Sequence, residues 1–247
     1  MVKKRASFPC FRSVKSQMME RYIFNFRMRP DDLARKLPVP WLTPQAINGW
    51  CAVSFCILWL ERVMLAPLPA LINFKTISCA YRIGVIDTSG SEPEPWVYIT
   101  DRWADLAIIP KISPLILLDT IPLVNAAIGH AGETTHVQLS KTDGNHLFSA
   151  ETQPTHAEIE SEVFGSIDQF AQFIKEGVSS YAPSLFANTY SKVDLKKEDV
   201  SYEALNARIE YSALSEQWND VEMIFDSAVR AKGAGYKWTY RGLWEDK

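Results

Sequence analysis

Short apolar or alternating runs dominate the first hundred residues, and they predict a series of β-strands. Residues 22–28 (YIFNFRM) alternate and are rich in aromatic side chains. Residues 49–60 (GWCAVSFCILWL) are apolar on both faces, which is typical of a buried strand. Further strands are predicted over about residues 73–86 and 96–100. Between the strands, Pro67 and Pro69 form one break, the sequence DTSGSEPEP forms another, and a short helix is expected from Pro30 to Lys36.

The second half of the chain mixes strands with helical segments. The apolar stretch 106–128 contains three prolines, so we expect short helical or irregular pieces that pack on the sheet. Residues 134–140 and 146–151 predict a hairpin across an Asp-Gly turn, with Val137 and Leu139 facing the core. Ser166 is expected to cap a helix over about residues 167–177. Two closing strands are predicted at 202–214 and 237–240.

These elements indicate an α+β, mainly β fold. Strands dominate and helices are few, which favours a closed or partly closed antiparallel sheet, either barrel-like or a sandwich, with peripheral helices. No repeat or flexible linker interrupts the pattern, so we expect residues 1–247 to form a single domain.

Charge and composition then exclude several classes of protein. The net charge is −3, with 26 basic and 29 acidic residues, so no long-range attraction for nucleic acid or for anionic lipid is expected. The two long apolar stretches contain charges and prolines, which disfavours membrane spans. Residues 1–5 are basic but no apolar signal segment follows. The 4 cysteines are expected to be buried and reduced, because Cys51 and Cys56 point to opposite faces of one strand, and this suits a cytoplasmic protein.

No motif for common cofactor or nucleophile chemistry occurs in the sequence. The four histidines have no metal-ligand spacing, and no nucleophile elbow surrounds any serine. The glycines near Gly233 have no phosphate-binding pattern and are interpreted as a turn or bulge. We therefore expect neither a metal nor another cofactor. Glu61 is interpreted as part of an ion pair with Arg62 at a strand end, or as a residue at the mouth of a pocket.

Lys111 is the one candidate for covalent chemistry, because it stands alone in the apolar sequence LAIIPKISPLILL. If this segment is buried, the pKa of the amine falls, and a neutral amine attacks a ketone to form a Schiff base. The alternative is a lysine whose aliphatic stem covers apolar surface while its amine reaches water.

Several segments together resemble the acetoacetate decarboxylase-like superfamily, over about residues 18–130. The resemblance rests on the succession of residues 20–38, 48–55, 68–74 and 78–85. It implies a Schiff-base lysine after a proline, which Pro110-Lys111 matches. It also implies homo-oligomerisation. The chain departs from the decarboxylases in having Ile112 where a second lysine is usual, and Ser54 and Thr76 near the positions of two glutamates.

A branch of uncharacterised bacterial proteins in that superfamily is more similar, at residues 49–55 and 121–126. That branch often has a core arginine. In this chain Ala80 stands at the corresponding position, and Arg82 lies one strand step beyond it on the same face. The leading hypothesis is therefore a lysine-dependent decarboxylase or lyase acting on a small keto acid, with Arg82 or Arg21 holding the carboxylate. The other candidate substrate-binding residues are Ser54, Glu61, Thr76, Ser78 and the aromatic residues Trp50, Tyr81 and Trp96.

Two alternatives remain open at this point. One is a non-catalytic binder of a small apolar or aromatic metabolite in the same internal pocket. The other is a structural or partner-binding protein with a filled interior.

Overall fold

The computed structural model describes residues 3–5, 13–66 and 74–245, which form a mainly β fold with four short helices in that part of the chain. The strands are β1 (Lys3–Arg5), β2 (Ser13–Met28), β3 (Leu42–Pro44), β4 (Ala46–Ile47), β5 (Trp50–Ala66), β6 (Phe74–Asp87), β7 (Glu94–Ala104), β8 (Val124–Ala131), β9 (Thr134–Lys141), β10 (His146–Pro154), β11 (Ser179–Pro183), β12 (Thr189–Lys197), β13 (Tyr202–Ser212) and β14 (Ile224–Glu245). The helices are α1 (Pro30–Ala34), α2 (Ile109–Leu117), α3 (Ile167–Glu176) and α4 (Ala213–Gln217).

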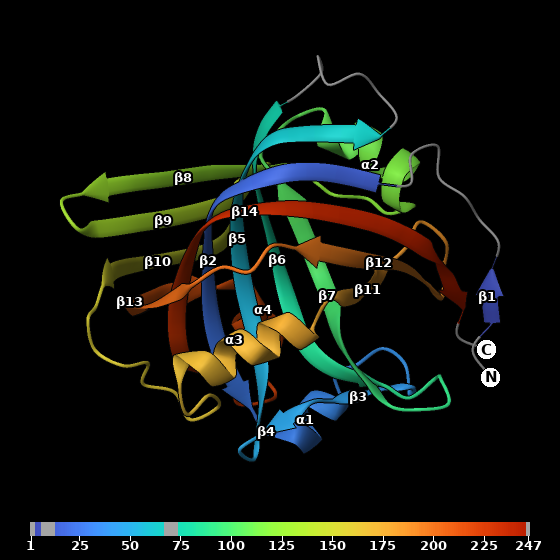
Figure 1. The fold of residues 1–247 in the computed structure, drawn as a ribbon, viewed down its shortest axis with the longest axis horizontal. Coiled ribbons are helices and arrows are strands. Elements are labelled where there is room, and N and C mark those ends of the chain that lie inside the picture. Colours follow the sequence, from blue (N-terminus) through green and yellow to red (C-terminus); the bar gives the residue numbers. More distant parts are fainter. Residues whose placement is uncertain (1–2, 6–12, 67–73, 246–247) are drawn as a thin grey trace.

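Seven strands close into an uneven ring in the order β14-β2-β5-β6-β7-β11-β12, with β12 pairing back onto β14. All neighbours in the ring are antiparallel except β11 and β7, which are parallel. Strand β14 has 22 residues, and two different strands share one of its edges. Its second half pairs with β12 and closes the ring, while its first half pairs with β13, which continues into β10, β9 and β8. Figure 1 shows these four strands extending to one side of the ring.

The two faces of the central strands pack into two separate cores. Side chains that point out of the ring, such as Phe24, Phe55 and Tyr81, pack against Phe148 and its neighbours from the β8–β10 extension. Side chains that point into the ring include Ile23 and Cys56. This division follows from the alternation of side chains along a strand. The ring interior is where the enclosed space of the fold lies.

Two helices cover the ring interior. α2 contributes Ile109, Ile112 and Ile116 to its lining, and α3 contributes Phe173 and Ile174. Figure 1 shows α3 crossing the front of the ring strands and α2 near their upper end. Close contact of α3 requires a glycine on β6, since a Cβ at Gly84 would lie 2.7 Å from the Phe173 ring. Among the described residues, no helix is both long and apolar enough to cross a bilayer.

The strongest local patterns predicted their elements well. Strands were expected at 22–28, 49–60 and 73–86: residues 22–28 lie in β2, residues 50–60 in β5 and residues 74–86 in β6, while residue 73 lies outside the described residues. The hairpin and the Ser166 cap are confirmed; the Ser166 hydroxyl accepts a hydrogen bond from the Gln169 backbone N–H. Cys51 and Cys56 lie in different cores, as alternation required. The break at Pro67 and Pro69 and the position of Cys10 lie outside the described residues.

Three predictions were wrong in their extent. The 106–128 stretch was expected to be helical or irregular, but it ends in strand β8. The glycines near Gly233 were interpreted as a turn or a bulge; they lie inside β14, where Gly233 has a φ of +68°, so the turn alternative was wrong. The closing strands at 202–214 and 237–240 were only part of the closure, because β11 and β12 complete the ring and were not predicted.

Candidate functional site

A small basic chamber lies inside the ring, under α3. It encloses about 40 Å³ and is lined by Arg21 from β2, Cys56 from β5, Arg82 from β6 and Lys197 from β12, together with Ser54 and apolar residues. Strand register explains why they meet: Ser54 is opposite both Asn25 and Arg82, and Ile23 is opposite Cys56, so these side chains share the inner face. The chamber has room for roughly two or three water molecules.

The polar groups of the chamber are only partly matched within the protein. Arg21 is 3% exposed, and its Nε donates a hydrogen bond to Cys56 Sγ at 3.1 Å. The Lys197 amine donates a hydrogen bond to the Ile174 carbonyl. Arg82 makes no recorded hydrogen bond or ion pair with any described residue, and its buried Nε has no acceptor there. A buried guanidinium N–H without an acceptor is costly to the fold.

Electrostatic coupling shifts the pKa values of this cluster. Burial lowers the pKa of Lys197 to about 7, and repulsion from Arg21 and Arg82 adds to this effect. Burial and the same kind of repulsion also lower the pKa of Arg82. Burial alone would raise the pKa of the Cys56 thiol, but attraction to Arg21 and Arg82 and the hydrogen bond from Arg21 outweigh it, so this pKa is lowered.

The other described cysteines behave differently, which makes Cys56 distinct. Burial raises the pKa of Cys51 to about 11 and also raises that of Cys79. Both are free thiols, like Cys56. Only Cys56 of these three lies beside buried guanidinium groups, so the thiolate form is favoured there alone.

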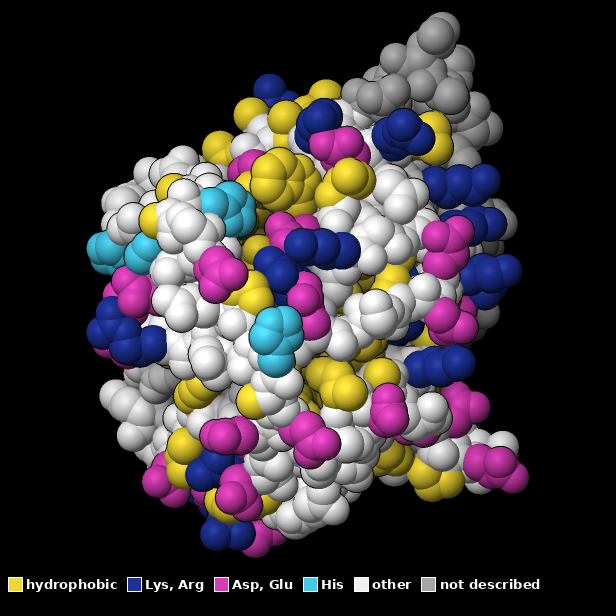
Figure 2. Space-filling model, turned by 60° about the vertical axis from the view of Figure 1, so that its left-hand side comes forward, with side chains coloured by type: hydrophobic (Ala, Val, Ile, Leu, Met, Phe, Trp, Pro, Cys, Tyr) yellow, Lys and Arg dark blue, Asp and Glu magenta, His cyan; other side chains and the backbone are white. Residues whose placement is uncertain are grey.

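No carboxylate lines the basic chamber among the described residues, so its charge balance is strongly positive. The surface is different: Figure 2 shows acidic and basic side chains interspersed on the face in view. Two guanidinium groups and one amine gathered around a single thiol form a site that attracts an anion. Arg21 and Arg82 supply planar donor arrays suited to a carboxylate.

A second, apolar chamber adjoins the basic one inside the ring. It encloses about 160 Å³, and Arg82, Val97, Gly177 and Leu195 belong to the lining of both. Most of its other walls are aliphatic, from the ring strands and from α2. Two of the hydroxyls in its wall donate to protein acceptors: Thr76 donates to Asp105 Oδ1 at 2.9 Å, and Ser78 donates to the Trp103 carbonyl at 3.3 Å.

Lys197 also borders a depression on the outside of the ring. Its lining contains four further basic side chains and one acidic side chain, Glu198. The basic residues are Lys15, Arg62, Lys196 and Lys237. This positive potential favours the approach of an anion toward the strand end that carries Lys197.

Five residues proposed from sequence line the two chambers. Arg21 and Ser54 line the basic chamber, Thr76 and Ser78 line the apolar one, and Arg82 lines both. Ser54 donates a hydrogen bond to Asn25 Oδ1 at 2.8 Å, so its hydroxyl proton is already used.

Lys111 does not meet the condition set for it, which was burial in an apolar environment. The residue is exposed on α2 and is absent from the lining of both chambers. The reason is helical periodicity, because Ile108 and Leu115, one turn away on either side, are 46% and 45% exposed and share its outward face.

The remaining proposed residues also lie away from the chambers. Tyr81 points into the outer core, where its hydroxyl contacts Ser212 at 3.0 Å. Trp96 stacks on Tyr181 in that core, at 4.6 Å between ring centroids. The Arg29 guanidinium lies over Trp50, with its central carbon 3.9 Å from the centroid of the Trp50 ring. Glu61 forms an ion pair, but with Lys75 at 2.6 Å rather than with Arg62.

Sequence analysis missed Lys197 and Cys56 as site residues. Val193, Leu195 and Lys197 alternate along β12, so Lys197 continues an inward-facing apolar row. That period-two pattern was the available signal. Cys56 had no signal beyond burial, since its special position depends on Arg21 and Arg82 from other strands.

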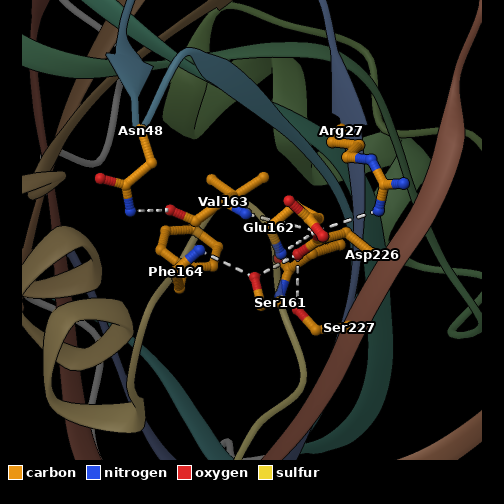
Figure 3. A network of polar contacts seen from close by, with 9 residues as sticks. Arg27, Asn48, Ser161, Glu162, Val163, Phe164, Asp226 and Ser227 are labelled. Carbon is orange, nitrogen blue, oxygen red and sulfur yellow. Dashed lines mark hydrogen bonds and ion pairs between the residues drawn. The ribbon is translucent and has the colours of Figure 1, made fainter.

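A second buried polar cluster surrounds Asp226, at the other end of β2 and β14 (Figure 3). The Asp226 carboxylate accepts hydrogen bonds from the backbone N–H groups of Glu162 and Val163, at 2.9 and 3.3 Å, and from the hydroxyls of Ser161 and Ser227. Arg27 Nη1 lies 3.6 Å from it. This cluster fastens the segment before α3 to β14.

The fold is that of acetoacetate decarboxylase-like proteins. Acetoacetate decarboxylase from Legionella pneumophila superposes with a TM-score of 0.62 at 12% identity, over 98% of this chain and 89% of that one. An acetoacetate decarboxylase-like enzyme from Sphingomonas wittichii has a TM-score of 0.57 at 13% identity, over 93% of each chain. The resemblance found in the sequence therefore predicted the fold correctly.

An enzyme of enduracididine biosynthesis, MppR, has the same fold. Its complex with pyruvate superposes with a TM-score of 0.55 at 14% identity, over 96% of this chain and 90% of that one. No family profile and no curated protein sequence matches the chain.

Proposed function

We propose that the ring interior binds a small oxo acid, with its carboxylate at Arg21 and Arg82 and its carbonyl at Lys197. The observation that carries this proposal is the basic chamber, whose lining holds two guanidinium groups, one amine and no carboxylate among the described residues. A ligand carboxylate would supply the acceptors that Arg82 lacks. Binding of pyruvate by MppR, a protein of the same fold, supports this class of ligand.

Lys197 is the amine suited to covalent chemistry in this site. A pKa of about 7 leaves roughly half of the amine neutral at pH 7, whereas an ordinary lysine is almost fully protonated. The neutral amine adds to the ligand carbonyl carbon, and loss of water gives a Schiff base. The protonated Schiff base then withdraws the electron pair of a bond to the neighbouring carbon.

The same geometry bears on which bond breaks. Carbon dioxide loss requires the carboxylate to become neutral, yet Arg21 and Arg82 stabilise its charged form. Interactions stronger in the ground state than in the transition state slow a reaction. The site therefore favours reactions in which the carboxylate is kept, such as condensation or another lyase reaction, and disfavours decarboxylation. Release of carbon dioxide from acetoacetate is the assay that separates the two.

Reductive trapping tests the proposal. The protein is incubated with pyruvate and sodium borohydride, and the modified peptide is identified by mass spectrometry. Modification of Lys197 is expected, together with its loss in Lys197→Met. Lys111→Met is the matched control, because Lys111 is an exposed lysine outside both chambers. Modification that disappears in Lys111→Met instead would contradict the assignment.

A non-catalytic binder is the second candidate, and one observation favours it. No carboxylate or histidine lines either chamber in the described part of the chain, so Lys197 and Cys56 are the chamber residues left to transfer protons. Pyruvate binding measured by calorimetry without any reductive trapping would support the binder and exclude the Schiff base.

A further inference from the structure

The apolar chamber next to the basic one defines what the rest of the ligand looks like. The two chambers share Arg82, Val97, Gly177 and Leu195 in their linings, so a ligand held by Arg82 has the apolar chamber directly beside it. A Cβ at Gly177 would lie 3.0 Å from Val97 Cγ2, so the absence of a side chain keeps the shared boundary open.

The apolar chamber has the size of an aromatic ring. It encloses about 160 Å³, and an apolar protein cavity of about 150 Å³ is known to hold benzene. Its far wall is formed by α2 through Ile109, Ile112 and Ile116. A linear chain much longer than a benzyl group would therefore meet the helix.

Most polar groups in the wall of the apolar chamber are already bonded to protein groups and need no hydrogen-bond partner from a ligand. Thr76, Ser78 and Ser180 donate their hydroxyl protons to Asp105, to the Trp103 carbonyl and to the Val193 carbonyl. Arg102 is ion-paired with Asp119. An apolar guest leaves these bonds intact, while the buried Nε atoms of Arg102 and Arg82 have no acceptor among the described residues.

We infer that the preferred ligand is an oxo acid with an aromatic or similarly compact apolar side chain, of the arylpyruvate class, whose ring occupies the apolar chamber while its carboxylate meets Arg82. This inference rests on the proposed function and narrows it from small oxo acids in general to those carrying one ring-sized apolar group.

Calorimetric titration with three probes tests this inference: pyruvate, phenylpyruvate and phenylacetone. Burial of the phenyl group is expected to make phenylpyruvate bind about ten- to a hundredfold more tightly than pyruvate. Phenylacetone has the ring but no carboxylate, and we expect it to bind at least tenfold more weakly than phenylpyruvate.

A pair of variants on α2 ties the effect to the chamber. Ile112→Trp places a large side chain in the chamber, and the ratio of pyruvate to phenylpyruvate dissociation constants is expected to fall close to one. Leu115→Trp is the matched control, since Leu115 is 45% exposed on the outer face of the same helix. It should leave the ratio unchanged.

The outcomes separate the inference from the proposed function. Equal binding of pyruvate and phenylpyruvate overturns the aromatic preference and leaves oxo-acid binding standing. Equal binding of phenylacetone and phenylpyruvate shows an apolar site that ignores the carboxylate, which overturns the proposed function. Binding of none of the three overturns both.

Discussion

The two buried polar clusters of this protein differ in whether the chain completes them. Asp226 carries one negative charge, and the protein surrounds it with two backbone donors, two hydroxyls and the Arg27 guanidinium (Figure 3). The basic chamber carries the positive charges of Arg21, Arg82 and Lys197, and its lining offers no carboxylate among the described residues. In the folded protein the charge of the first cluster has a full set of partners, whereas the positive charges of the second lack a negative counter-charge.

This difference separates a structural role from a functional one. A buried charge with a full set of partners holds segments together, and removing it leaves its donors unsatisfied. Buried like charges without partners destabilise the fold and persist where binding or catalysis needs them. The two clusters should therefore respond to mutation with opposite signs of stability change.

The largest effect is expected at Asp226. Asp226→Ala leaves two backbone N–H groups, two hydroxyls and Arg27 without their acceptor, so the free energy of unfolding should fall by about 3–5 kcal/mol. Urea denaturation followed by fluorescence measures it. Asp199→Ala is the control, because the Asp199 side chain is 89% exposed and forms an ion pair only with Lys175 among the described residues. A loss below about 1 kcal/mol at Asp226 would mean that the network carries little stability.

The opposite sign is expected at Arg82. Arg82→Met removes an unpartnered guanidinium and its repulsion with Arg21, and the free energy of unfolding should rise by about 1–4 kcal/mol. The same urea experiment measures it, with Lys111→Met as an exposed control expected within about 0.5 kcal/mol. Destabilisation by Arg82→Met would erase the contrast between the clusters.

The reactivity of Lys197 should depend on pH through a midpoint near 7. Its pKa of about 7 lies below the ordinary 10.5, so the neutral fraction rises about tenfold between pH 6 and pH 8. The initial rate of pyruvate trapping by cyanoborohydride at Lys197 should rise by a similar factor. A rate that increases only above about pH 9 would indicate an ordinary, solvated amine.

The smallest effect concerns the polar link between the clusters. Ser54 donates to Asn25, Asn25 donates to Ser227, and Ser227 donates to Asp226, so a chain of hydrogen bonds joins the chamber wall to the Asp226 network. Ser54→Ala breaks one neutral hydrogen bond and should cost about 1 kcal/mol of unfolding free energy. A loss near that of Asp226→Ala would show that the two clusters act as one unit.

The parts of the fold that sequence predicted are those with a local signal. An apolar run over residues 49–60, and alternation with turn residues in the Asp-Gly hairpin, predicted strands that the structure has as β5, β9 and β10. Ring closure through β12 and β14 is a pairing of distant segments. Its register runs from Thr189 opposite Glu245 to Lys197 opposite Tyr236, and the sequence of neither segment alone predicts it.

Arg21 and Arg82 were proposed through the resemblance, Arg82 because it lies one strand step beyond the position of the superfamily's core arginine, and both line the basic chamber. Lys111 was proposed because it stands alone among apolar residues, but it lies on the outward face of α2, and a run of apolar neighbours hides that helical periodicity. The charge cluster itself depends on four strands meeting, which no single segment reveals.

One experiment tests directly whether the basic chamber is an anion site held at the expense of stability. Urea denaturation of the wild-type protein and of Arg82→Met is measured with and without saturating pyruvate. Wild-type protein should be the less stable of the two without pyruvate and should gain stability when pyruvate is added, whereas Arg82→Met should start higher and gain little. Equal stabilisation of both proteins by pyruvate, or no stabilisation of either, would contradict the account.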